Sequence, residues 1–561
     1  MGVSLIDHPE GGRTRPRTWA LPPRVRQILH PLAVSLLTLA FIACSTQESR
    51  APRAYDQRQA EEMFSSGYHD ISDIFIEERK ISTLAMAGLE GLSDIDPALE
   101  IKRVGSLVAV EVDGVPAGRY IAPEANDADG WADITVAALS GGRSFSVALG
   151  EADAERIYDA VFGGMVSELD AYSRYSGLEE AQENRASRDG FGGIGVRIDV
   201  VDEGVRVISV MDGTPADVAG LLGDDLIVRI EDETAAGLSQ RLAVRRLRGP
   251  IGTKVRLTVS RPGRPEGLEI TVTRAHIVPQ TVEFRAEGKI AYFRVSSFNQ
   301  STAQNLEQMI RQAREQMGPE LSGMIIDLRD NPGGLLDQAV DVADLFVASG
   351  RIVSTHGRHP DSHQYFDAQA NIPAGEVPVA ILINRGSASA SEIVAAALQD
   401  VGRAVVIGSN SYGKGTVQTV LRLPNQGELT LTWAQFHAPS GYGLQGRGVL
   451  PDICTSQERV TSADDVFDLL RSGEMPIAYA TRVRNVDSED LAALEHLRAI
   501  CPGREGDNEI DMKVARHLLT TPELYDRALG RSPGGPGSSN LARRGALSAK
   551  VGCGGAGNRL C

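Results

Sequence analysis

The chain has 561 residues, with 57 Lys and Arg against 74 Asp and Glu, which gives a formal net charge of −17. This acidity argues against nucleic acid as a partner, because phosphate binding needs a basic face. Hydrophobic residues make up 42% of the chain, enough to bury several cores, so we expect a multidomain globular protein.

Residues 1–43 have the pattern of an export signal. Five arginines precede an apolar run that ends at Ala43. The run is short for a bilayer span and is typical of the hydrophobic part of a signal peptide. Small residues directly before Cys44 resemble a bacterial lipoprotein signal, although Phe41 stands where leucine is usual. We therefore predict a periplasmic lipoprotein with Cys44 lipidated and residues 44–54 as a polar tether to the membrane; ordinary secretion is the alternative.

Residues 55–187 are expected to form a helical N-terminal region that a strand-rich piece interrupts. Apolar residues recur at helical spacing from Tyr55 to Leu99 and again from Ile157 to Leu169. Between them, residues 101–149 contain β-branched runs bounded by Gly, Pro and Asp, which predict strands. The expected strands are Val104–Val112, Ile134–Leu139 and Phe145–Leu149.

Residues 188–277 contain a glycine-rich loop with strand patterns on both sides. The loop Phe191–Val196 and the segments after it resemble a PDZ domain. A nucleotide-type glycine loop is disfavoured, because that loop leads directly into a helix. In a PDZ domain, backbone amides of the loop cradle a terminal carboxylate and the adjacent strand edge pairs with the peptide. The resemblance implies that a protein tail with a free C-terminus binds at Gly193, Ile194, Gly195 and Val196.

Residues 278–455 alternate strand and helix patterns, which indicates a largely parallel αβ sheet. The expected strands include Ile290–Val295, Gly323–Leu328, Pro378–Ile383, Ala404–Ile407 and Glu428–Trp433, and the expected helices are 301–317, 335–348 and 391–399.

Two segments of this region carry side chains suited to acyl transfer. Ser387, Ser389 and Ser391 lie in a turn between a strand and a helix, where the positive helix end stabilises developing negative charge. Lys414, flanked by glycines, follows the next strand. A buried lysine with a lowered pKa can take the proton of a serine hydroxyl. Taken alone, the same residues also fit tight packing and a solvated surface lysine.

The segments Gly386–Ile393 and Tyr412–Gln418 resemble the signature of the carboxyl-terminal processing peptidases, or tail-specific proteases. These are PDZ-containing serine peptidases with a Ser/Lys dyad and a crotonase/ClpP-like αβ protease core. The resemblance implies that Ser389 is the nucleophile, that Lys414 is its general base and that Gln418 orients the lysine. The spacing of the two segments matches the family's register and selects the middle serine.

The loop Leu328–Gly334 resembles the family loop whose glycine amide completes the oxyanion hole. The other donor would be the amide of Ala390, and backbone donors of this kind supply a large electrostatic term in acyl transfer. Pro332 stands where the family often has Asn or Gly, so Gly333 and Gly334 both remain candidates. The resemblance implies no cofactor.

Two features of the sequence depart from the family pattern. The 101–149 piece is an insertion relative to the family's helical arm, and Ala171-Tyr172 replaces the usual Pro-His pair. We expect no metal site at His356, His359 and His363, because the segment 350–361 has the pattern of an exposed polar connection.

Glu392 is expected to complement the helix dipole, and a role in orienting the site stays open.

The C-terminal part divides into a helical region, residues 456–530, and a low-complexity tail, residues 531–561, whose composition predicts disorder. Cys454 and Cys501 could form a disulfide, since export permits one, or could remain reduced.

The prediction from sequence is an α/β multidomain serine endopeptidase that cleaves exported proteins near their C-termini. Its PDZ domain would bind the substrate tail, and its Ser/Lys dyad would perform acyl transfer. One alternative is an inactive PDZ adaptor that presents tails to another protease. Another is an acyl-coenzyme A hydratase, which the related fold suggests and the export signal disfavours. The sequence leaves open whether the protein forms a homo-oligomer.

Overall fold

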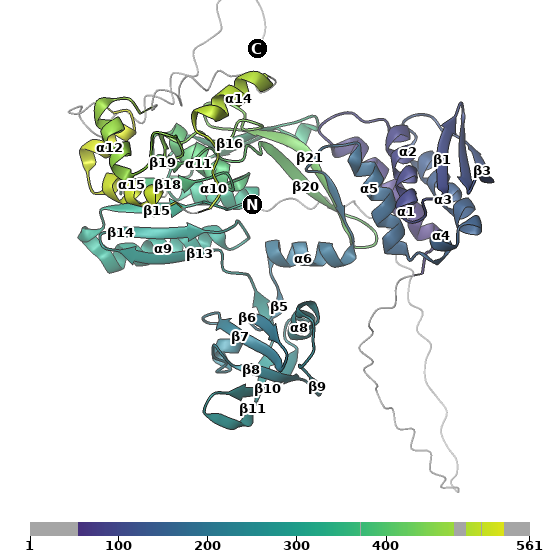
Figure 1. Cartoon of the computed structure of the whole chain (residues 1–561), viewed down its shortest axis with the longest axis horizontal. Helices are drawn as coiled ribbons and strands as arrows, with labels where there is room; N and C mark the ends of the chain where they lie inside the picture. The colour runs from purple at the N-terminus through teal and green to yellow at the C-terminus, as the bar shows by residue number, and fades with distance from the viewer. Residues whose placement is uncertain (1–53, 371, 476–489, 507, 532–561) are drawn as a thin grey trace, which may run out of the picture.

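The computed structural model describes residues 54–370, 372–475, 490–506 and 508–531. The predicted signal, Cys44 and the tail after Arg531 lie outside this part of the chain. Within it, three bodies are apparent: an N-terminal domain, a PDZ domain and a large αβ core (Figure 1). No helix of the described residues is long and apolar enough to cross a membrane.

The N-terminal domain packs helices around a small antiparallel sheet. Its sheet has the order β1-β2-β3. Trp131 of α3 is fully buried between this sheet and the other helices. The helices are α1 (Gln57–Ile74), α2 (Ile81–Gly91), η1 (Leu92–Asp94), α3 (Ala128–Phe145), α4 (Val147–Glu151) and α5 (Ala154–Ser167), and the strands are β1 (Leu99–Val104), β2 (Leu107–Val112) and β3 (Val115–Ile121).

The strand-rich insertion is shorter than predicted, because only β1 to β3 are strands. The expected strands Ile134–Leu139 and Phe145–Leu149 are wrong, since both segments lie mainly in helices α3 and α4. Asp127 caps α3 by accepting a hydrogen bond from the Gly130 amide, and the buried side chains of α3 recur at helical spacing. A short apolar, β-branched run has the same pattern in a buried strand and on a buried helix face. Here tertiary packing favours the helix in both segments.

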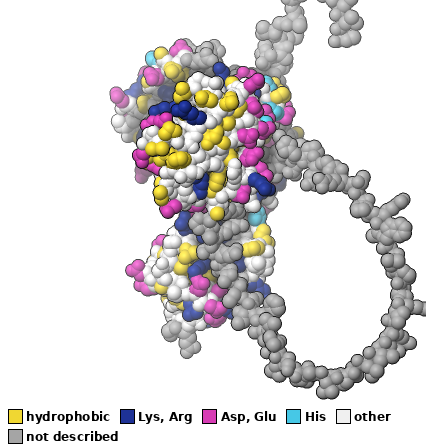
Figure 2. Space-filling view, turned by 90° about the vertical axis from the view of Figure 1, so that its right-hand side faces the viewer, with side chains coloured by type: hydrophobic (Ala, Val, Ile, Leu, Met, Phe, Trp, Pro, Cys, Tyr) yellow, Lys and Arg dark blue, Asp and Glu magenta, His cyan; other side chains and the backbone are white. Residues whose placement is uncertain are grey.

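Apolar side chains also lie on the outside of the N-terminal domain. Figure 2 views the molecule from this end and shows hydrophobic side chains across the domain's face. The large exposed ones in this region are Val104, Val115, Ile121, Phe145 and Val147.

The PDZ domain has an antiparallel sheet in the order β11-β10-β8-β7-β6, so that β6 forms an edge. Strand β5 pairs with β12 where the chain enters and leaves the domain. The elements are β5 (Phe191–Gly193), β6 (Val196–Val201), β7 (Gly204–Val210), α7 (Pro215–Val218), β8 (Leu226–Ile230), β9 (Glu233–Thr234), α8 (Gln240–Leu247), β10 (Lys254–Arg261), β11 (Arg264–Thr273) and β12 (Ala275–Ile277). Helix α6 (Leu178–Asp189) leads from the N-terminal domain into this unit (Figure 1).

The core contains a six-stranded sheet in the order β13-β14-β15-β18-β19-β22, parallel from β14 onward, as the strand–helix alternation predicted. Alternate strand residues face opposite layers: Ile326 packs toward α9, α10 and α11, while Ile325 packs toward α12, α15 and α16. The strands are β13 (Val282–Glu287), β14 (Ile290–Val295), β15 (Gly323–Asp327), β18 (Val379–Ile383), β19 (Ala404–Gly408) and β22 (Ile453–Cys454). The helices are α9 (Thr302–Met317), η2 (Gly318–Glu320), α10 (Leu336–Asp344), α11 (Ala390–Asp400), α12 (Ala463–Ser472), α14 (Leu491–Ile500), α15 (Glu509–Leu519) and α16 (Pro522–Ala528).

A second sheet joins the core to the N-terminal domain. Its order is β17-β16-β21-β20, and β4 pairs with β21. The hairpin of β20 and β21 extends from the core toward the N-terminal domain, and Leu423, Leu429 and Leu431 pack into that domain's apolar cluster (Figure 1). The elements are β4 (Arg174–Ser176), β16 (Arg351–His356), η3 (Pro360–Ser362), β17 (Gln364–Asp367), β20 (Thr416–Arg422) and β21 (Glu428–His437).

The structure also tests three further sequence predictions. The segment 350–361 is not simply an exposed connection, because β16 pairs with strands on both sides and four of its residues are buried. The helical prediction for 456–530 is confirmed by α12, α14, α15 and α16. Cys454 and Cys501 form a disulfide, which decides between the two alternatives.

Candidate active site

Ser389 occupies a strained turn between β18 and α11. Its φ is +55° and its ψ is −114°, a conformation that a residue with a Cβ rarely adopts. The turn makes Ser389 the N-cap of α11 and leaves it partly accessible. A sharp turn of this kind between a strand and a helix is how α/β-hydrolases expose a serine nucleophile.

The hydroxyls of the two neighbouring serines form structural hydrogen bonds. Ser387 is fully buried, and its hydroxyl donates to the carbonyl of Leu328 at 2.8 Å. Ser391 is also fully buried and donates to the carbonyl of Asn331 at 2.9 Å. Both hydroxyls therefore fasten the 328–334 loop to the nucleophile turn, and the Ser389 hydroxyl is the one left accessible for chemistry.

Lys414 lies half-buried just before β20. Its pKa is lowered from the ordinary lysine value, first by burial and then by the nearby Arg174, while Asp170 and Glu392 oppose this shift. Its Nζ lies 5.0 Å from the centroid of the Tyr172 ring, so the residue that departs from the family pattern faces the lysine. A lowered pKa increases the fraction of neutral lysine, the form that can accept a proton.

Gln418 lies on β20 close to Lys414 in sequence. Its side-chain amide donates to the hydroxyls of Thr416, at 2.9 Å, and Thr432, at 3.0 Å. Within the described residues, no hydrogen bond joins Lys414 Nζ to Gln418 or to Ser389. The orienting role of Gln418 therefore stays a prediction.

Glu392 connects the turn at Ser389 to the loop at Lys414, and the sequence had left open whether it helps to orient the site. Its buried carboxylate accepts hydrogen bonds from the amides of Ser389 (2.7 Å), Gly413 (2.7 Å) and Lys414 (3.0 Å) and from the hydroxyl of Ser411 (2.5 Å). Burial raises the pKa of Glu392 to about 7, although these four donors oppose the shift. One side chain thus fixes the distance between the nucleophile turn and the loop that carries the lysine.

The 328–334 loop reaches Ser389 through glycine. Gly333 has a φ of +100°, and a Cβ there would lie 2.7 Å from the Ala388 carbonyl oxygen and 2.9 Å from the Ala390 nitrogen. A side chain at this position would therefore cover the amide of Ala390. Glycine is required for the loop to approach the nucleophile this closely.

The neighbouring amides of this loop differ in their partners. The Gly333 amide donates to Asn331 Oδ1 at 2.9 Å. Phe298 donates to the Gly333 carbonyl and accepts from the Leu335 amide, so the Gly334 amide faces the opposite way. Within the described residues, neither the Gly334 nor the Ala390 amide donates to another protein group.

The PDZ loop has the features that the sequence predicted. The carbonyls of Ile194 and Gly195 accept bonds from within the domain, from the amides of Ala216 and Met211. The amides of Ile194 and Gly195 donate to no other group among the described residues. Gly195 has a φ of +84°, and a Cβ there would lie 2.3 Å from Thr214, so glycine is required. The loop continues into β6, whose outer edge pairs with no strand of the described chain.

The histidines do not form a metal cluster in the described part of the chain. His356 and His363 approach one another with 3.3 Å between their Nδ1 atoms, and the ring of His437 lies 5.1 Å from that of His356. His359 instead accepts from the Asp361 amide.

Comparison with known proteins gives matches to both central domains. A family model described as peptidase family S41 matches residues 289–455, and a PDZ domain model matches residues 192–272. A carboxy-terminal-processing protease from Bartonella bacilliformis is 42% identical over 307 residues, which cover 54% of this chain and 71% of the relative.

A probable CtpA-like serine protease from Staphylococcus epidermidis is 32% identical over 317 residues, or 56% of this chain and 64% of that protein. The chain thus spans slightly less than two thirds of the staphylococcal relative. Among solved structures, a photosystem II D1 C-terminal processing protease aligns with 70% of this chain and 92% of its own, at 22% identity and a TM-score of 0.36.

Proposed function

The chain belongs to the carboxy-terminal-processing proteases of peptidase family S41, a family of serine-type peptidases, and from this premise we propose how it acts. We propose that it is an endopeptidase that cleaves exported proteins near their C-termini, with Ser389 and Lys414 as a catalytic dyad. The observation that carries the proposal is the strained, partly accessible Ser389, whose amide donates to the same Glu392 oxygen as the amide of Lys414, a half-buried lysine whose pKa is lowered.

In the proposed reaction, the neutral Nζ of Lys414 takes the proton of Ser389 as Oγ attacks the scissile carbonyl carbon. The Lys414 ammonium then donates this proton to the leaving amine, which leaves an acyl-enzyme on Ser389. Lys414 next takes a proton from a water molecule as that water attacks the ester carbon. The Lys414 ammonium then returns the proton to Ser389 Oγ as the C–Oγ bond breaks, which releases the carboxylic acid product and the free enzyme. Glu392 keeps the two motifs in register through these steps, since it holds the amides of both.

The developing oxyanion needs backbone donors in the same place. We assign the first donation to the Ala390 amide at the N-terminus of α11, where the helix dipole adds to it. We assign the second to Gly334, because the Gly333 amide already donates to Asn331 Oδ1.

We further propose that the PDZ domain holds the tail of the substrate. The amides of Ile194 and Gly195 are available for a terminal carboxylate, and the edge of β6 can pair with an extended peptide. Together with the predicted export signal and Cys44, this gives a periplasmic, membrane-tethered enzyme that acts on exported chains.

The test of the proposed function is hydrolysis of an unstructured protein with an apolar C-terminal tail. Wild type, Ser389→Ala, Lys414→Ala and Ser391→Ala are compared side by side, with circular dichroism to confirm folding. We expect no turnover by the first two variants and retained activity in Ser391→Ala, whose hydroxyl has a structural role.

Two outcomes would contradict the proposal. An active Ser389→Ala with an inactive Ser391→Ala would identify Ser391, two residues later, as the nucleophile. Tail binding by the wild type without any hydrolysis would favour the PDZ adaptor.

A further inference from the structure

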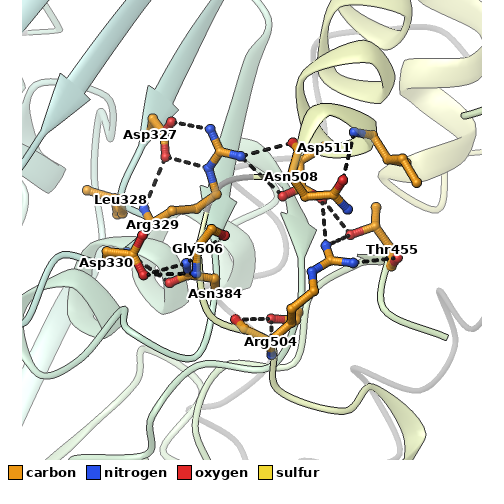
Figure 3. A network of polar contacts seen from close by, with 12 residues as sticks. Asp327, Leu328, Arg329, Asp330, Asn384, Thr455, Arg504, Gly506, Asn508 and Asp511 are labelled. Atoms are coloured by element: carbon orange, nitrogen blue, oxygen red, sulfur yellow. Dashed lines mark hydrogen bonds and ion pairs between the residues drawn. The ribbon is translucent and has the colours of Figure 1, made fainter.

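Residues 498–506 run across three loops that carry catalytic groups. We call this segment the strap. The base loop is residues 409–415, the nucleophile loop is 384–389 and the oxyanion loop is 328–334. The strap begins in the last turn of α14 and ends shortly before α15. Figure 3 shows part of it, with Arg504 and Gly506 beside the nucleophile and oxyanion loops.

Arg498 connects the strap to the base loop. Its Nη1 donates to the carbonyls of Tyr412 and Gly446, both at 3.1 Å, and its Nη2 donates to the carbonyl of Ser411 at 3.3 Å. A Cβ on Gly413 would lie 3.0 Å from the same Nη1. The guanidinium therefore fixes the main chain directly before Lys414 and ties it to a second segment.

A disulfide fixes the helix that carries Arg498. Cys501, three residues later, is bonded to Cys454 of β22, the strand next to β19 in the central sheet. Both cysteines are at most 1% exposed and pack with Leu450 and Leu497. Because the disulfide is buried, it is a permanent clamp in the folded protein and not a readily reversible switch.

The end of the strap bonds to the other two loops. The Arg504 carbonyl accepts from the Arg385 amide at 2.9 Å, and the Gly506 carbonyl accepts from Asn384 Nδ2 at 3.2 Å. The same Asn384 accepts from the Asp330 amide at 2.8 Å and donates to its carboxylate at 2.8 Å (Figure 3). The strap, the nucleophile loop and the oxyanion loop thus share one hydrogen-bond network.

Helix α15 anchors this network through a buried carboxylate. Asp511 is 1% exposed and accepts from the Thr455 hydroxyl at 2.5 Å. It also pairs with Arg329 of the oxyanion loop at 3.3 Å and with Arg504 of the strap at 3.5 Å. The network is therefore anchored on α15 and on the segment that follows β22 (Figure 3).

We propose that the strap positions the three catalytic loops, with Arg498 as the positioning residue for the base loop and the Cys454–Cys501 disulfide as its clamp. This inference rests on the proposed Ser389–Lys414 dyad. If Arg498 no longer holds the base loop, Lys414 becomes more solvated and is protonated over a wider pH range. Turnover then suffers more than substrate binding, because tail binding takes place in the PDZ domain.

The first experiment compares Arg498→Ala and Arg498→Lys with wild type across pH. The lysine keeps the charge but cannot donate in a fork to three carbonyls. We expect kcat to fall at least tenfold in Arg498→Ala, with KM changed less than twofold, and the acid limb of the kcat/KM profile to move to higher pH. Arg498→Lys should recover only part of the rate.

The matched control is Arg527→Ala. Arg527 also donates to main-chain carbonyls, those of Leu470 and Arg471, but it lies on α16 away from the catalytic loops. A loss in Arg498→Ala no larger than in Arg527→Ala, or a lower rate with an unmoved acid limb, would overturn the positioning role.

The second experiment has a readout that needs no activity. Amide hydrogen exchange is measured on Ser389→Ala protein with and without Cys454→Ala and Cys501→Ala, and Cys553→Ala with Cys561→Ala is the control pair. We expect faster exchange in residues 409–415 only when the strap disulfide is removed, with strand β10 of the PDZ domain unchanged. Unaltered exchange in the base loop would overturn the clamp. A fully active Ser389→Ala, by contrast, would overturn the dyad and leave this exchange result standing.

Discussion

At the residue scale, the proposed oxyanion hole depends on the absence of a side chain at Gly333. Its main chain lies against Ala388 and Ala390, so that even a methyl group would overlap the proposed oxyanion donor. The nearest atoms are two backbone atoms and the Ser389 Cβ, and none of them can rotate away. A larger residue at position 333 should therefore raise the free energy of the transition state, in which the oxyanion forms.

We predict that Gly333→Ala lowers kcat by about 10² to 10³, the usual loss for an oxyanion donor, while KM changes little. The measurement is steady-state hydrolysis of one peptide substrate by both proteins. Gly350→Ala is the control, because Gly350 has nearly the same φ, +99°, and no atom lies within 4 Å of the place that its methyl group would take. Equal losses in both variants would trace the effect to backbone strain and not to the oxyanion site.

Glu392 is a buried carboxylate with four hydrogen-bond donors, and its charge state should control the site. Glu392→Gln keeps one acceptor oxygen for the amides of Ser389 and Lys414, but it turns a side-chain NH2 toward the Gly413 amide and the Ser411 hydroxyl. Hydrogen bonds to a charged group contribute about 1.5 to 3 kcal/mol each, so we predict a loss in kcat of about tenfold or more. Comparison of kcat at pH 8, with the folded fraction measured in parallel, checks this.

The same variant tests the raised pKa of Glu392. The folded protein holds this proton up to about pH 7, whereas an exposed glutamate loses it near 4.5. The resulting stabilisation is present below pH 4.5 and is lost as pH rises to about 7. Urea unfolding at pH 5 and pH 8 should show wild type losing stability relative to Glu392→Gln as pH rises. A pH-independent difference would contradict the raised pKa.

The proposed reacting groups were easier to find in the sequence than the hydrogen bonds that connect their loops. The strand–turn–helix pattern around Ser389 and the glycines around Lys414 are local, so the chain itself displays them. The carboxylate of Glu392 holds residues as far as 22 positions away, and Ser387 donates to a carbonyl 59 positions away. Bonds between distant segments depend on how the sheet orders its strands, which periodicity does not reveal.

Helix α6 is the element that connects the PDZ domain to the rest of the molecule. Arg185 and Arg188 on this helix pair with Glu428 at 2.8 and 2.9 Å, and the Glu428 side chain is only 4% exposed. At its other end, Glu179 pairs with Arg241 and Arg245 of α8, the PDZ helix. The helix thus touches both the PDZ domain and the strand that pairs with β20 (Figure 1).

We predict that Glu428→Gln destabilises the protein by about 1.5 to 3 kcal/mol, because its buried carboxylate loses charged hydrogen bonds to two partly exposed arginines. Glu179→Gln is the matched control: its pairs are exposed, and such pairs contribute about 0 to 1 kcal/mol. Thermal unfolding of both variants gives the comparison. A Glu428→Gln midpoint no lower than that of Glu179→Gln would show that this junction carries little of the stability.

Sequence reasoning missed the elements whose secondary structure depends on packing or pairing with other segments of the chain. Ile134–Leu139 is helical because α1 and the small sheet pack around α3, and no local signal separates this run from a strand. The segment with three histidines contains β16, whose strand character comes from pairing with β17 and β21. The parallel core, in contrast, was predictable, since its long apolar runs alternate regularly with helical patterns.

At the level of the whole molecule, selection of substrates should depend on the free tail. A tail carboxylate held at the PDZ loop raises the local concentration of the chain near Ser389, which lowers the apparent KM. We predict a higher kcat/KM for a substrate with a free C-terminus than for the same substrate with an amidated one. Equal values, together with unchanged kinetics after deletion of residues 188–277, would leave the PDZ domain without a role in selection.

We also predict that the mature protein begins at a diacylated Cys44 and partitions with membranes. Two acyl chains hold a protein firmly, whereas one chain anchors it weakly. Mass spectrometry of the N-terminal peptide from a membrane fraction measures this directly, and Cys44→Ala should move the protein to the soluble fraction. An unmodified N-terminus near Ala43 in soluble protein would contradict the anchor.

The β20–β21 hairpin limits how this protein can be cut into pieces. A recombinant fragment of residues 278–455 would keep the hairpin but expose Leu423, Leu429 and Leu431, and each buried leucine is worth about 1.5 to 3 kcal/mol. Without the helices of the N-terminal domain, the exposed leucines at the end of the hairpin would also promote aggregation. The core and the N-terminal domain therefore share one apolar cluster. Expression trials should retain residues 55–187, and a chimera that exchanges the core between relatives should exchange the N-terminal domain with it.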